Sequence, residues 1–66
     1  MNDLQARLEK LHTDAADCAL ISELATELRK RELFARLAAH LRGLAREIER
    51  EISERGRLEL RTSAHD

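Results

Sequence analysis

The stretch "HTDAADCALISELATELRKRELF", residues 12 to 34, joins two segments with helical patterning and decides the fold. It holds the only cysteine of the chain and no glycine or proline. Thr26 followed by Glu27 is typical of a helix start, because a threonine side chain can accept hydrogen bonds from the first helical turn. We therefore expect a corner between two helices near Thr26. A break near Thr13, or one uninterrupted helix from Asp14 to Arg55, are the alternatives.

The composition favours helices throughout. The 66 residues suffice for one domain; proline is absent, glycine occurs twice and Phe34 is the only aromatic residue. Alanine, leucine, glutamate and arginine, which dominate, are strong helix formers, whereas strands usually draw on β-branched and aromatic residues. The chain is therefore expected to be all-α.

The first segment carries an apolar stripe with steps of four and three: Leu4, Leu8, Leu11, Ala15 and Cys18. Ile21, Ala25 and Leu28 continue it after an extra step of three. On an ideal helix the apolar faces before and after Cys18 differ by roughly a quarter turn. This offset is the reason for expecting a break near Thr13.

The second segment has a more regular stripe, formed by Phe34, Ala38, Leu41, Ala45, Ile48 and Ile52 and flanked by Leu33, Leu37 and Leu44. Its apolar arc spans about 140° and suits a helix with two neighbours. Chains this small usually need a disulfide, a metal or a partner for stability, and one cysteine cannot form an internal disulfide. We therefore predict a two-helix hairpin that dimerises into a four-helix bundle. Its expected interface residues are Leu4, Leu8, Leu11, Ile21, Leu24, Leu28, Phe34, Leu37, Leu41, Leu44, Ile48 and Ile52.

Gly56 follows Arg55, which is a pattern typical of a helix end. The hairpin is accordingly expected over residues 1–56, with residues 57–66 as a flexible C-terminal tail. Arg57 to Thr62 alternates polar and apolar residues as a short strand does, but no second strand is expected to pair with it.

No residues are predicted to be catalytic, cofactor-binding or metal-ligating. Cys18 lies on the apolar stripe beside Asp17 and is expected to be a small buried hydrophobic residue rather than a reactive thiol. His12, His40 and His65 do not have metal-ligand spacing. Since there is also no glycine-rich phosphate loop, we expect a protein that is not an enzyme and takes no cofactor.

The formal net charge is −1, so no overall field attracts nucleic acid or anionic lipid. The longest apolar run is too short to span a membrane, and the N-terminus lacks a secretion signal, so a cytoplasmic location is expected. The leading function is a non-enzymatic protein-interaction or scaffolding module that acts as a homo-oligomer. The alternative is a small nucleic-acid-binding regulator that contacts phosphates through Arg29, Lys30, Arg31 and Arg36, although Glu27 and Glu32 flank this basic cluster.

A set of residues between 15 and 47 has a familiar order: Cys18, Leu24-Ala25-Thr26, Arg31, Leu37-Ala38 and Leu44-Ala45. In this respect the chain resembles a group of short, mostly uncharacterised α-proteobacterial helical proteins. In that group Asp-Pro follows the threonine, whereas here Glu27 and Leu28 follow Thr26. The resemblance implies a helical hairpin with its corner near Thr26 and implies no activity.

Overall fold

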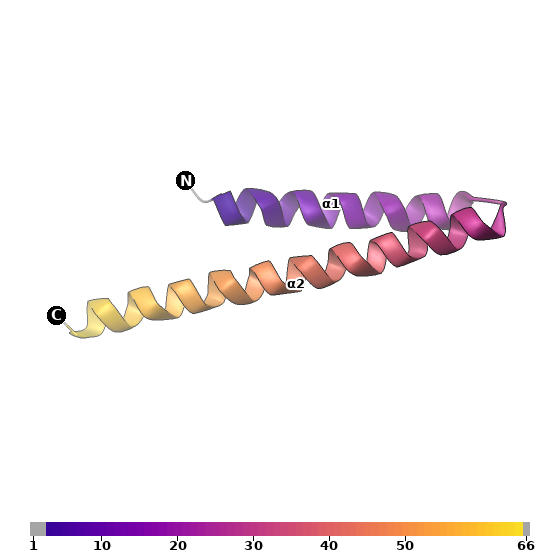
Figure 1. The fold of residues 1–66 in the computed structure, drawn as a ribbon. Coiled ribbons are helices and arrows are strands. Elements are labelled where there is room, and N and C mark those ends of the chain that lie inside the picture. Colours follow the sequence, from indigo (N-terminus) through magenta and orange to yellow (C-terminus); the bar gives the residue numbers. More distant parts are fainter. Residues whose placement is uncertain (1–2, 66) are drawn as a thin grey trace.

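The computed structural model describes residues 3–65, with side chains described as far as residue 58. It contains two helices, α1 (Asp3–Leu24) and α2 (Leu28–His65), which run antiparallel as a hairpin and include no strand in the described range (Figure 1). The molecule measures 59 × 18 × 12 Å. The expected all-α hairpin is therefore confirmed, and the single uninterrupted helix is excluded.

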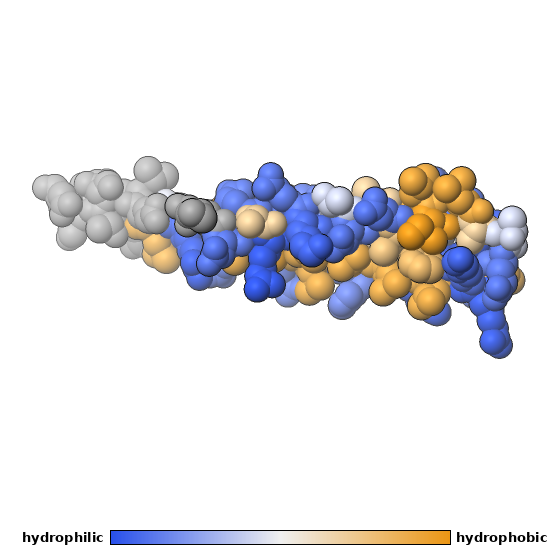
Figure 2. Space-filling model, turned by 90° about the horizontal axis from the view of Figure 1, so that it is seen from above, coloured by the Kyte–Doolittle hydropathy of each residue, from blue (hydrophilic) through white to orange (hydrophobic). Residues whose placement is uncertain are grey.

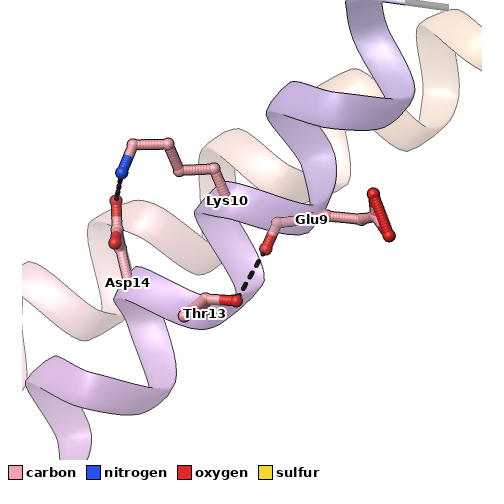
Figure 3. A network of polar contacts seen from close by, with 4 residues as sticks. All are labelled: Glu9, Lys10, Thr13 and Asp14. Atoms are coloured by element: carbon pink, nitrogen blue, oxygen red, sulfur yellow. Dashed lines mark hydrogen bonds and ion pairs between the residues drawn. The ribbon is translucent and has the colours of Figure 1, made fainter.

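The helix α1 runs through Thr13 without a break, so the expected break at this position is wrong. The Thr13 hydroxyl donates a hydrogen bond of 3.0 Å to the backbone carbonyl oxygen of Glu9, one helical turn earlier (Figure 3). Such a bond back to residue i−4 is the usual arrangement of a threonine in a helix interior. On the same surface, Lys10 Nζ lies 3.7 Å from Asp14 Oδ2, as an i,i+4 ion pair.

The turn consists of Ala25, Thr26 and Glu27, where the sequence predicted it. The backbone N–H of Ala25 donates to the carbonyl oxygen of Ile21 (2.9 Å) at the end of α1. The N–H of Arg31 donates to the carbonyl oxygen of Glu27 (3.0 Å), which makes Glu27, rather than Thr26, the N-terminal capping position of α2. No described residue has a positive φ, so this corner forms without glycine.

The helix α2 continues past Gly56 to His65, so the helix end expected at Gly56 is wrong. Gly56 does not adopt the left-handed conformation that terminates helices. The residues after it, Arg57 to Arg61, are mostly strong helix formers, and these propensities favour continuation. Because α2 has 38 residues and α1 has 22, α2 extends beyond the N-terminal end of α1 (Figure 1). The expected flexibility of residues 57–66 stays a prediction.

The two helices meet along one seam of buried and half-buried residues. The first helix and the turn contribute Leu4, Leu8, Leu11, Ala15, Cys18, Ser22 and Ala25, and α2 contributes Phe34, Ala38, Leu41, Ala45, Ile48 and Ile52. Only three side chains in the described part are fully buried: Ala15 (3% exposed), Ala38 (2%) and Ala45 (1%). Small side chains at the contact allow the helix axes to approach closely.

The buried side of α1 differs from the apolar stripe that the sequence indicated, because it includes Ser22. Ser22 is half-buried and continues the steps of four and three from Cys18 to Ala25, whereas Ile21 lies beside the seam with 38% of its surface exposed. With Ser22 in the stripe, no quarter-turn offset remains. This is why α1 needs no break.

Candidate interaction surface

An open groove runs between the helices on one side of the seam. It has a volume of about 510 Å³ and is lined by Arg7, Lys10, Leu11 and Asp14 of α1 and by Leu44, Glu47 and Ile48 of α2. Its floor is apolar and its rim is charged. The α1 wall carries Arg7 together with the ion pair of Lys10 and Asp14, and the α2 wall carries Glu47.

Helical periodicity extends this groove into a longer surface, which we call the open face. Residues seven positions apart share one side of a helix. Arg7, Asp14 and Ile21 have this spacing on α1, and Leu37, Leu44 and Glu51 have it on α2. The open face therefore consists of these six residues, together with the apolar floor of the groove.

The opposite side of the seam is polar. His12 Nε2 lies 3.7 Å from Glu49 Oε2 across the two helices, and both side chains are about half exposed. Because His12 and Asp14 are two positions apart, they lie about 200° apart around α1. The contact between His12 and Glu49 thus marks the side of the seam that faces away from the open face.

Large apolar side chains are exposed mainly toward the turn. Within the described part of the chain, the exposed ones are Leu20, Ile21, Leu24, Leu28, Leu33, Leu37, Leu44 and Leu58. Four of them lie within the segment from Leu20 to Leu28, which includes the turn. Figure 2 shows hydrophobic surface gathered at the end where the helices are joined and continuing along one edge of the molecule. Exposed apolar patches are often found where proteins bind other proteins.

The structure divides the twelve residues predicted at the interface into two sets. Seven are half-buried along the seam: Leu4, Leu8, Leu11, Phe34, Leu41, Ile48 and Ile52. The other five are exposed: Ile21, Leu24, Leu28, Leu37 and Leu44. Leu11, Leu44 and Ile48 come together in the groove. The sequence reasoning missed Arg7, Lys10, Asp14 and Glu47 at its rim, although the seven-residue spacing from Arg7 through Asp14 to Ile21 was a usable signal.

The basic cluster Arg29, Lys30, Arg31 and Arg36 lies at the start of α2, and all four side chains are exposed. None of the ion pairs found between described residues includes them. A helix N-terminus carries a partial positive charge, so three cations in the first turn are unfavourable for α2. Glu27 and Glu32 flank these three cations in the sequence.

Three further features of the described residues bear on a site: a cysteine that could be reactive, side chains that could hold a metal ion, and helices that could span a membrane. Cys18 is a free thiol, half-buried on the seam. Within residues 3–58, no three His, Cys, Asp or Glu side chains are close enough together to hold a metal ion. Neither helix, over its described length, combines the length and apolarity that a membrane crossing requires.

Comparisons of the chain with protein-family models, with curated proteins and with solved structures gave no match. The resemblance to short α-proteobacterial hairpin proteins stays a prediction. The surface itself is therefore the basis for a functional proposal.

Proposed function

We propose that this chain is a small, non-enzymatic protein-interaction or scaffolding module that acts as a homodimer, with the open face as its dimer interface. The observation that carries the proposal is the incomplete burial of large apolar side chains. Within the described residues, no large side chain is fully buried, and only three alanines form the core. A hairpin of this size gains little stability from such a core, and association supplies the missing burial.

The shape of the open face agrees with this proposal. Its apolar residues continue the seam outward, so a second pair of helices laid on them would complete a four-helix bundle. The other side of the hairpin, marked by His12 and Glu49, is charged and suits contact with water.

Sedimentation equilibrium tests the dimer directly. We expect the wild-type chain to have twice the monomer mass at micromolar concentration, and Leu37→Glu to dissociate it. Removing a buried leucine costs about 2 kcal/mol, and a symmetric dimer contains the residue twice. The dissociation constant should therefore rise by about three orders of magnitude.

Ala35→Glu is the matched control, because Ala35 is exposed on the same helix and lies about 160° away from Leu37. This variant should dimerise like the wild type. A wild-type chain that is monomeric and melts cooperatively at micromolar concentration would contradict the proposal.

The second candidate function is contact with nucleic-acid phosphates through the basic cluster, and the observation in its favour is the exposure of all four unpaired cations. Retention on heparin at low salt, lost when Arg29, Lys30 and Arg31 are replaced by alanine, would support it. Absence of retention by the wild-type chain would remove it.

A further inference from the structure

We propose that two copies of this chain pack open face against open face with both turns at the same end of the bundle. This inference rests on the proposed homodimer and adds the orientation of its subunits. The occupant of the open face is thus a second copy of the chain, related by a two-fold axis that runs along the length of the hairpin.

The open face is uneven along its length, and this unevenness distinguishes the two ends. Asp14 and Leu44 line the same groove, between the cross-helix contacts Ser22–Arg31 and His12–Glu49, and this places them at about the same level. Because the helices are antiparallel, moving seven residues toward the turn on each helix leads from Asp14 to Ile21 and from Leu44 to Leu37, which again share one level. Seven residues away from the turn lead to Arg7 and Glu51. The turn half of the face is apolar, and the far half carries opposite charges.

A two-fold axis along the hairpin keeps every residue at its own level. In this arrangement α1 of one copy lies against α2 of the second copy. Ile21 then meets Leu37, and the nearby Leu33 adds to this apolar contact. At the middle level Asp14 meets Leu44, with the Asp14 carboxylate 3.7 Å from Lys10 Nζ of its own chain. At the far end Arg7 meets Glu51 and Lys10 meets Glu47, which pairs opposite charges across the interface.

The opposite orientation, with the turns at the two ends of the bundle, lays α1 on α1 and α2 on α2. Arg7 and Ile21 lie equally far from Asp14, which is near the middle of α1. With the two-fold axis at the level of Asp14, which gives the longest overlap of the open faces, Ile21 would meet Arg7, and Asp14 would meet its own copy. On α2, Leu37 would meet Glu51. Burying charges against apolar groups and pairing like charges are both unfavourable. The same-end dimer has such contacts only between Asp14 and Leu44, whereas the opposite orientation has them at Arg7 and Glu51 and also pairs Asp14 with its own copy, so the same-end orientation is favoured.

Distance measurements between spin labels test the orientation. The full chain carries Cys18→Ala to remove the native thiol, and a single label is attached at Thr26→Cys in the turn or, as a second probe of the same end, at Arg29→Cys. Neighbouring helices lie about 8–10 Å apart. Labels at the turn should therefore lie within about 25 Å in the same-end dimer. In the opposite orientation the length of α1, about 33 Å, separates them.

Asp17→Cys is the control, because Asp17 lies near the middle of α1 and its labels stay within about 25 Å in either orientation. Short distances at the turn and at residue 17 support the proposal. Short distances at residue 17 with turn distances above about 33 Å overturn the orientation and leave the homodimer intact. If no dipolar coupling between labels is seen at any position and sedimentation equilibrium gives the mass of a monomer, both the dimer and the orientation are overturned.

Discussion

The hydroxyl group of Ser22, on α1, donates a hydrogen bond of 2.7 Å to the backbone carbonyl oxygen of Arg31, on α2. This contact joins the two helices one turn away from the corner. It gives the only serine on the seam a polar partner and fixes the register of α1 against α2 near the turn. Such a bond contributes about 1 kcal/mol to stability.

Ser22→Ala should therefore destabilise the hairpin relative to Ser53→Ala by about 1 kcal/mol. Ser53 is exposed within α2 and provides the same gain in helix propensity. Urea denaturation of both variants at one chain concentration measures the difference. Equal stabilities of the two variants would show that the cross-helix bond contributes nothing.

Thr13→Ala should leave stability unchanged or raise it by about 0.5 kcal/mol, because alanine is the better residue inside a helix. If Thr13 instead capped a second helix, its replacement would cost about 1 kcal/mol. Thermal unfolding followed by circular dichroism distinguishes these outcomes, and a clear loss of stability would contradict the continuous α1.

Gly56→Ala should raise the free energy of unfolding by about 1 kcal/mol, as expected for glycine in the interior of a helix. A Cβ atom at Gly56 would meet no atom within 4 Å, and the residue has no positive φ. Gly43→Ala is the matched control, because Gly43 also has open space around it. Destabilisation by Gly56→Ala alone would mean that the helix ends there after all.

Ala45→Leu should destabilise the chain by about 2 kcal/mol, since overfilling a tight contact forces the helices apart. Ala45 is 1% exposed at the seam. Ala39→Leu, at an exposed position of α2, should have little effect on the same urea denaturation curve. A tolerated Ala45→Leu would argue against close approach of the helices.

The position of the turn could be predicted because Thr26 and Glu27 follow one amphipathic segment and precede another. The end of α2 could not be predicted, because Gly56 is compatible with both a helix end and a helix interior. Only its backbone conformation, set by the helix-forming residues on both sides, separates the two. The prediction of a break at Thr13 was wrong for a different reason. The polar residue Ser22 lies on the seam, and a search for apolar residues alone does not find it.

The apolar residues of the candidate surface were predictable, but its charged residues and its arrangement were not. Leu37 and Leu44 were expected at an interface from the width of the apolar arc. The position of Leu44 beside Arg7 and Asp14 in the groove follows from the antiparallel register, which places distant parts of the chain at one level.

The sequence alone determined that two amphipathic helices form and that they are joined near Thr26, because propensity and periodicity act within a few residues. The tertiary structure decided which residues lie on the seam and which remain on the open face. That choice depends on how closely the backbones approach at Ala15, Ala38 and Ala45. It also depends on the partner that Ser22 finds across the turn, and both are properties of the packed pair of helices.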